Sequence, residues 1–224
     1  MSNNINGNIQ EICIQKTSFK GSSSHPFHQL TPDFILNALD ELGYITDSRL
    51  LPLNSYENRV YQIGIQDSSP IIGKFYRPNR WNKKQILEEH QFCFELVEQE
   101  LPIVAPLISE GGESLFQYKG FHFALFPRKG GYGPELDNLD NLYLLGKLLG
   151  RIHAVGSIRP FSHRNTLNSN TFGYESSKFV SENFIPAELK LSYDSLVKDL
   201  MKTIDEVVSN AGDIQNIRVH GDCH

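Results

Sequence analysis

The hydrophobic pattern of this chain changes character once, and that change limits the folds available to it. Up to about residue 126, short apolar runs alternate with polar turns, which is typical of β-strands. Beyond Pro127 and the pair Gly130-Gly131, apolar residues recur every three or four positions, which is typical of amphipathic helices. We therefore expect an α+β chain with a strand-rich lobe, a hinge and a helical lobe.

The strand-rich part predicts a five-stranded antiparallel lobe with one inserted helix. An earlier helix is expected to begin at Thr31, which can cap its N-terminus, with Pro32 in its first turn. The long inserted helix is expected at about residues 83–100. Strands are predicted at residues 50–53, 60–65, 71–76, 115–118 and 121–126.

The helical part carries two long apolar faces, one within residues 142–152 and the other within residues 189–207. The expected organisation is a flexible tail at residues 1–30, a first lobe at 31–126, a hinge at 127–131 and a second lobe at 132–224. The tail is assigned because it is rich in Asn, Ser and Gln.

Composition narrows the class of partner. The chain has 21 Lys and Arg against 26 Asp and Glu, a formal net charge of −5, and no basic block. This favours a small molecule or a protein over a nucleic acid. No apolar run is long enough to span a bilayer, and the N-terminus is polar, so we expect a cytoplasmic protein without a membrane partner.

Lys74 lies in the middle of an apolar strand, where an unpaired ammonium group is costly to bury. Its side chain can extend to the sheet edge, or it can meet nucleotide phosphates and an acidic partner. Helical geometry places Glu89 beside the apolar face of the following helix and turns Glu88 toward solvent, together with Glu95. We therefore predict that Glu89 is the partner of Lys74 and that Glu88 is solvated.

Two further segments can contact a nucleotide. The turn at residues 54–59 precedes Lys74, and Ser55, Asn58 and main-chain amides there can donate hydrogen bonds to phosphates, although an ordinary hairpin turn also favours these residues. The apolar run at residues 123–127 leaves one lobe for the other and can flank a purine ring.

The chain ends on His220-Gly221-Asp222-Cys223-His224. An apolar run at residues 217–219 predicts a strand, and Gly221 allows a sharp turn after it, which would place Asp222 just beyond the strand end. A carboxylate held there can accept the proton of a hydroxyl that attacks a phosphate. Alternatively, an extended segment would point His220, Asp222 and His224 to one side, where they can ligate a metal ion.

The order of these parts resembles the protein kinase-like bilobal fold, in the branch shared by aminoglycoside and choline kinases, which carries His-Gly-Asp-x-His-x-x-Asn. Within that branch, the chain is most similar to the bacterial stress response kinases. The similarity rests on residues 51–61 (LPLNSYENRVY), 74–78 (KFYRP) and 86–92 (ILEEHQF), and it extends from about Thr31 to His224.

The resemblance implies an ATP- and Mg²⁺-dependent kinase that phosphorylates serine and threonine of proteins, is cytoplasmic and monomeric, and acts in stress response. It implies that Asp222 accepts the proton, that Lys74 holds phosphates and that Ser55 touches the nucleotide. Asn58 and Glu89 complete the expected nucleotide site.

The family motif breaks off at His224, before the asparagine that would bind magnesium. We therefore expect a truncated helical lobe with uncovered apolar faces, and a weak or inactive fragment of an active parent. Two other functions remain open: a kinase of small molecules such as amino sugars, choline or homoserine, and a non-catalytic nucleotide-binding module.

Overall fold

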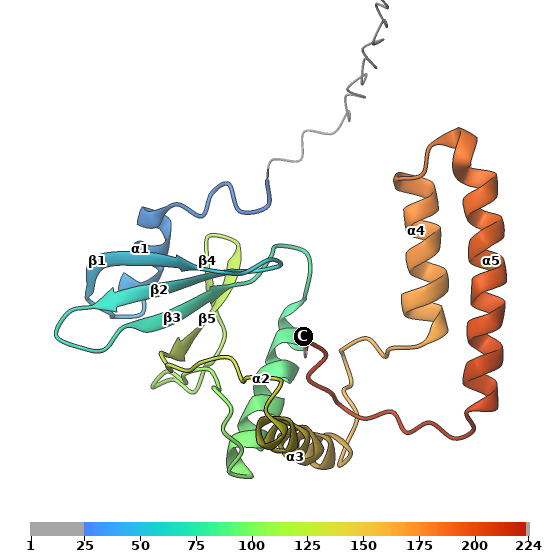
Figure 1. Cartoon of the computed structure of the whole chain (residues 1–224). Helices are drawn as coiled ribbons and strands as arrows, with labels where there is room; N and C mark the ends of the chain where they lie inside the picture. Colours follow the sequence, from blue (N-terminus) through green and yellow to red (C-terminus); the bar gives the residue numbers. More distant parts are fainter. Residues whose placement is uncertain (1–24, 223–224) are drawn as a thin grey trace, which may run out of the picture.

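The computed structural model describes residues 25–222 of the chain. Figure 1 shows a sheet with a helix on either side, followed by a helical region that ends in a long hairpin of two helices. In chain order the elements are α1 (Pro32–Asp40), β1 (Thr46–Leu53), β2 (Arg59–Ile65), β3 (Ile71–Phe75), α2 (Lys83–Glu98), β4 (Phe116–Tyr118), β5 (Phe121–Pro127), α3 (Leu139–Gly156), η1 (Ser169–Tyr174), α4 (Glu175–Asn183) and α5 (Ala187–Asn210).

The five predicted strands form one antiparallel sheet in the order β1-β2-β3-β5-β4. The helix that precedes the sheet begins as expected, because the Thr31 hydroxyl accepts a hydrogen bond from the backbone N–H of Phe34 at 3.2 Å. Strand β1 starts earlier than predicted, at Thr46, and α2 ends two residues earlier, at Glu98.

The main core lies between α1 and one face of the sheet. Ile35 and Leu39 of α1 pack with Phe75 and Phe123, whose rings stack at a centroid distance of 5.1 Å. Phe27 also belongs to this core and is 9% exposed. Residues 25–30 therefore belong to the folded structure, and the expected tail is wrong for them. Residues 1–24 lie outside the described part of the chain.

Helix α2 joins the sheet to the helical region. Its N-terminus is fixed by a capping box, in which Asn82 and Gln85 exchange side chain-to-backbone hydrogen bonds at 3.0 Å. Ile86 packs on the second face of the sheet near Ala124. Further along the helix, side chains pack against α3 in a separate core of Phe92, Leu96, Leu101, Ile152 and Val155. One helix thus contacts both parts of the molecule.

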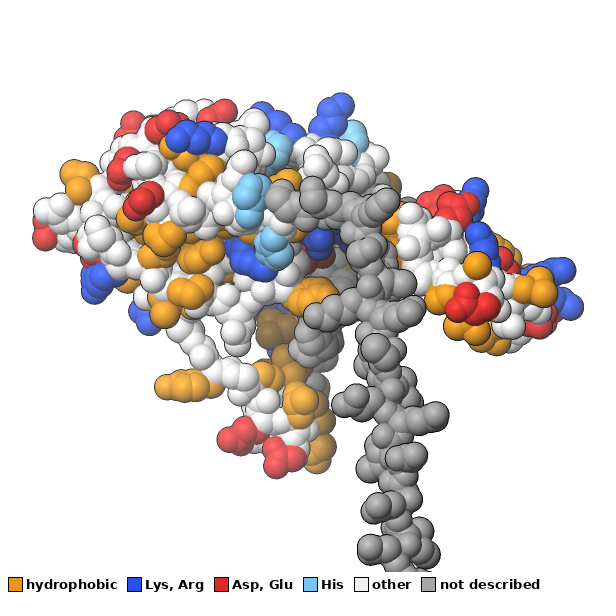
Figure 2. All heavy atoms as spheres, turned by 90° about the horizontal axis from the view of Figure 1, so that it is seen from above, with side chains coloured by type: hydrophobic (Ala, Val, Ile, Leu, Met, Phe, Trp, Pro, Cys, Tyr) orange, Lys and Arg blue, Asp and Glu red, His pale blue; other side chains and the backbone are white. Residues whose placement is uncertain are grey.

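The last two helices form a hairpin, and residues 211–222 follow it without helix or strand. Helices α4 and α5 lie side by side and apart from α3 (Figure 1), and η1 and α4 were not predicted. Apolar side chains of α5 are exposed, as expected; they include Leu189, Leu196, Leu200 and Val207. Figure 2 shows such side chains on the hairpin and, on the face in view, acidic and basic groups interspersed.

The strand expected at residues 217–219 does not form. The backbone N–H of Arg218 donates to the carbonyl of Gly156 in α3 at 3.2 Å, so this segment is held by a helix end. A strand needs a neighbouring strand to pair with, and none pairs with this segment among the described residues. Within residues 25–222, none of the helices has the length and apolar character required to cross a membrane.

Candidate active site

The predicted ion pair between Lys74 and Glu89 is present. The Lys74 ammonium lies 3.0 Å from Glu89 Oε1, and both side chains are partly buried. The ammonium also lies 4.8 Å from the centroid of the Tyr76 ring. Lys74 therefore has the acidic partner that the sequence indicated, and its contact with nucleotide phosphates stays a prediction.

A second cation, which the sequence did not indicate, binds the other oxygen of the same carboxylate. The guanidinium of Arg164, from the loop after α3, pairs with Glu89 Oε2. It also donates from Nε to the carbonyl of Gln85 at 3.0 Å and lies 4.3 Å from the centroid of the Trp81 ring. Burial tends to raise the pKa of Glu89, but Lys74 and Arg164 outweigh it, so this pKa lies below its ordinary value and the carboxylate stays charged.

The expectation that Glu88 and Glu95 are solvated is wrong. Glu88 accepts hydrogen bonds from three consecutive backbone N–H groups, of Ser162, His163 and Arg164. Glu95 forms ion pairs with Arg159 and Arg218. Part of the face of α2 that looks polar in sequence therefore contacts the second lobe, in addition to the apolar contact of Phe92 and Leu96 with α3.

The turn between β1 and β2 is closed by its own side chains. The Ser55 hydroxyl donates to the carbonyl of Leu53 at 3.2 Å and accepts from the backbone N–H of Val60 at 3.3 Å. Asn58 Oδ1 accepts from the backbone N–H of Arg77 at 3.3 Å, just beyond β3. The turn is therefore held against the strand that carries Lys74.

Glu57 ties the same turn to the start of α2. Its carboxylate accepts from Arg80 Nε at 2.9 Å and from the indole N–H of Trp81 at 3.0 Å. Because Trp81 also stacks with Arg164, a continuous set of contacts joins the turn, Trp81, Arg164 and the Lys74–Glu89 pair.

An apolar surface adjoins Lys74 on the sheet. In the antiparallel register Lys74 lies opposite Val60 on one side and Ala124 on the other, while Ile72 lies opposite Phe126. Paired residues, and residues two apart on one strand, share a face of the sheet. Val60, Ile72 and Phe126 are only partly buried, so this face can still accept an apolar ring.

Asp222 ends the described chain, and its side chain is exposed. Its backbone N–H donates to His220 Nδ1 at 3.3 Å. Four residues earlier, Arg218 is 3% exposed, and its guanidinium lies 2.8 Å from Glu95 Oε2 of α2. The segment that carries Asp222 is thereby anchored to the helix that carries Glu89, and Figure 1 shows the last described residues beside that helix.

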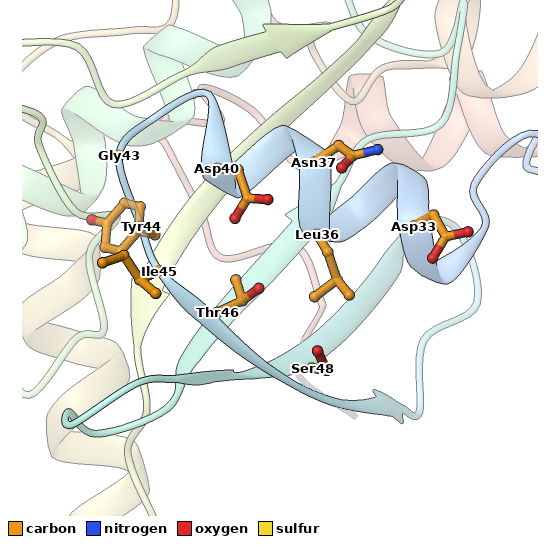
Figure 3. A pocket seen from close by; sticks show the side chains of 9 residues that line it. All are labelled: Asp33, Leu36, Asn37, Asp40, Gly43, Tyr44, Ile45, Thr46 and Ser48. Atoms are coloured by element: carbon orange, nitrogen blue, oxygen red, sulfur yellow. The ribbon is translucent and has the colours of Figure 1, made fainter.

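No group of three potential metal-ligating side chains lies within residues 25–222. The alternative metal site of His220, Asp222 and His224 includes His224, which lies outside the described residues. A surface depression between α1 and the start of β1 (Figure 3) is lined by Asp33, Asp40 and Thr46 among others, and contains none of the predicted site residues.

A lysine paired with a helix carboxylate, beside an antiparallel sheet and a helical second lobe, is the arrangement found in kinase-like phosphotransferases. The chain belongs to the phosphotransferase enzyme family (APH), which matches residues 49–224.

The chain is similar to stress response kinase A of Escherichia coli (strain K12), with 42% identity over 209 residues, covering 91% of this chain and 61% of the relative. A "Serine/threonine protein kinase RdoA" of Salmonella typhimurium is 41% identical, covering 88% of this chain and 60% of that protein. The chain thus spans about three-fifths of the length of these relatives.

Solved structures share the fold at low sequence identity. Amicoumacin kinase hAmiN, in complex with AMP-PNP, Ca²⁺ and Ami, has a TM-score of 0.58 at 19% identity, covering 75% of this chain and 53% of that one. A microcompartment-associated aminopropanol kinase has a TM-score of 0.52 at 18% identity, covering 65% and 48%. The expected protein kinase-like α+β fold is confirmed.

Proposed function

We propose that this chain binds ATP, and that the protein is a kinase that phosphorylates serine and threonine side chains of proteins. The observation that carries the proposal is the Lys74–Glu89 ion pair at 3.0 Å, placed beside a partly exposed apolar sheet face. In kinases of this fold, such a pair holds the lysine against nucleotide phosphates. Membership of the phosphotransferase family supports the same activity.

The nucleotide would lie along the face of the sheet that carries Lys74. The apolar side chains of Val60, Ile72 and Phe126 would contact the base, and the Lys74 ammonium would bind the phosphates. Ser55 and Asn58 stabilise the β1–β2 turn through hydrogen bonds of their own. Their proposed contribution is to position the turn so that its backbone N–H groups can approach the phosphates.

Asp222 is the proposed proton acceptor. In the reaction, the acceptor hydroxyl oxygen forms a bond to the γ-phosphorus, the bond from that phosphorus to the β-phosphate oxygen breaks, and ADP leaves. The hydroxyl proton passes to the Asp222 carboxylate. Magnesium, when bound to the nucleotide, would neutralise developing charge on the phosphates.

The proposal that the phosphate acceptor is a protein is based on the names of the relatives. Proteins at 41–42% identity are named stress response kinase A and serine/threonine protein kinase, which supports a protein acceptor and a role in stress response. Cytoplasmic location and a monomeric state belong to the same proposal. The names of the solved neighbours, amicoumacin kinase and aminopropanol kinase, support the second candidate, a kinase of small molecules.

ATP titration followed by thermal unfolding tests the nucleotide site. A ligand that binds only the folded state at 100 times its Kd stabilises by about 2.7 kcal/mol, which for a chain of this size raises Tm by about 5–10 °C. We expect this shift, with and without magnesium, for the wild type and for the control Lys190→Ala, whose side chain is exposed on α5. Lys74→Ala should abolish it.

An unchanged ATP shift in Lys74→Ala, or none in the folded wild type, would contradict the nucleotide site. The acceptor is tested separately with γ-labelled ATP, an unphosphorylated protein mixture and choline. Label on serine or threonine supports a protein kinase, and label on choline alone supports the small-molecule candidate.

A further inference from the structure

We propose that Arg164 is a positioning residue for nucleotide binding, which neutralises Glu89 and so leaves the positive charge of Lys74 available to the phosphates. This inference rests on the proposed ATP-binding function and adds a residue from the second lobe to that site. It is carried by the sharing of one carboxylate between two cations, Lys74 on Oε1 and Arg164 on Oε2.

Arg164 is held in place by several independent contacts. Its backbone N–H donates to Glu88 Oε2 at 2.9 Å, and its Nε donates to the Gln85 carbonyl at 3.0 Å. Its guanidinium stacks 4.3 Å from the centroid of Trp81, and that indole N–H is bound by Glu57. The guanidinium therefore has little freedom to leave Glu89, because both its backbone and its side chain are fixed to α2 and the segment before it.

The charges explain what such an arrangement achieves. A lysine paired with one carboxylate forms a neutral pair, which attracts an anion only weakly. Adding Arg164 gives the group of Lys74, Glu89 and Arg164 a net charge of +1, and the neighbouring Glu88 carboxylate is bonded to backbone N–H groups of the loop instead of to Lys74. In a partly buried site, where charges are less screened than at the surface, this excess charge favours a phosphate next to Lys74.

Glu89 also gains a fixed orientation from Arg164. With both oxygens engaged, the carboxylate cannot rotate away from Lys74, and it presents Oε1 to the ammonium at 3.0 Å. Loss of Arg164 would leave one oxygen without its cation and let Glu89 compete with the phosphates for Lys74. Loss of Arg164 should therefore weaken the binding of ligands that carry phosphates, and should leave the binding of the base unchanged.

The test compares the Kd of ATP with the Kd of adenosine, by calorimetry, for wild type, Arg164→Met, Arg164→Lys and Arg159→Met. Arg159→Met is the matched control, because it removes an arginine from the same loop that pairs with Glu95 instead of Glu89. We expect Arg164→Met to weaken ATP about 10-fold, equivalent to about 1.4 kcal/mol, and to change adenosine less than twofold. Arg164→Lys, which keeps the charge, should recover part of the loss.

Equal weakening of ATP and adenosine would assign Arg164 a purely structural role and overturn the proposal. So would unchanged or tighter ATP binding in Arg164→Met, or an effect no larger than that of Arg159→Met. If Arg164→Met does not fold, Arg164→Lys takes its place in the test. The Kd of ATP is then divided by the Kd of adenosine, and a ratio equal to that of the wild type would contradict the proposal. Loss of ATP binding in Lys74→Ala alongside normal binding in Arg164→Met would leave the proposed function standing and reject this inference alone.

Discussion

At the scale of single residues, His90 shows how burial beside the ion pair controls protonation. The side chain is 1% exposed, and its ring nitrogens are hydrogen-bonded to the Tyr76 hydroxyl and the Ser114 hydroxyl, each at 2.9 Å. Burial lowers the pKa of His90 to about 4, because the protonated ring loses solvation; Glu89 opposes the shift, and Lys74 and Arg164 favour it. His90 is therefore neutral at physiological pH.

This low pKa predicts a loss of stability in weak acid. Above about pH 6.5 the ring is neutral in both states, so folding is unaffected by its titration. As pH falls from about 6.5 to about 4, the unfolded state binds a proton that the folded state does not, which costs up to about 3 kcal/mol. Urea unfolding across this range should show a shallower pH dependence in His90→Gln than in the wild type.

The matched control for His90 is His153→Gln, on the exposed surface of α3, which should keep the wild-type slope. An identical slope in His90→Gln and the wild type would contradict the assignment of the acid sensitivity to His90.

At the scale of elements, α2 makes two different contacts through two adjacent glutamates. Glu89 faces Lys74 of the sheet, whereas Glu88 binds the loop at residues 162–164 through three backbone N–H groups. Burial tends to raise the pKa of Glu88, but these three hydrogen bonds lower it overall, which shows that the loop prefers the charged form. The helix is thereby fixed relative to the second lobe.

We expect Glu88→Ala to detach this loop from α2. Three N–H groups would lose their acceptor and turn to water, so the free energy of unfolding should fall by about 1–3 kcal/mol. Amide hydrogen exchange at residues 162–164 should accelerate. The control Glu98→Ala, exposed near the end of the same helix, should change both quantities little. Wild-type exchange rates at 162–164 in Glu88→Ala would contradict this role.

Local sequence predicts helix α2 and the pairing of its Glu89 with Lys74. It does not predict the contacts that Glu88 and Glu95 make with the second lobe. The capping residue Asn82, the apolar spacing around Ile86 and the position of Glu89 beside that face are local signals, and they led to the Lys74–Glu89 pair. Helical phase assigns Glu88 and Glu95 to solvent, because their partners lie more than 60 residues away in the chain, in the loop after α3 and at Arg218. The helical period indicates which side of the helix a residue lies on, but it does not indicate which other segment of the chain packs against that side.

At the scale of the whole molecule, α2 connects the proposed nucleotide site with the segment that carries Asp222. The first lobe was predictable because strand alternation and turns are short-range signals, while Arg164 lies in an irregular loop without periodicity. Arg218 did carry a signal, since an arginine between Ile217 and Val219 interrupts an apolar run. Such a residue is buried only with a partner, and the sequence alone does not identify Glu95 as that partner.

The Glu95–Arg218 contact should therefore be the strongest single link between the two parts. Arg218 lies 2.8 Å from Glu95, donates to the Val155 carbonyl at 3.0 Å, and stacks 4.3 Å from the centroid of the Phe92 ring. Because Arg218 is buried, Glu95→Gln would leave its charge uncompensated and cost about 3–5 kcal/mol in urea unfolding.

Two comparison variants separate this burial effect from a general loss of charge. Arg159, the other partner of Glu95, is largely exposed, so Arg159→Met should cost at most about 1 kcal/mol. The double variant Glu95→Leu/Arg218→Met removes both buried charges and should be more stable than Glu95→Gln alone, because no unpaired ion remains. If Glu95→Gln cost no more than Arg159→Met, the two parts of the molecule would be held together by the apolar contact of α2 with α3, and the ion pair would contribute little.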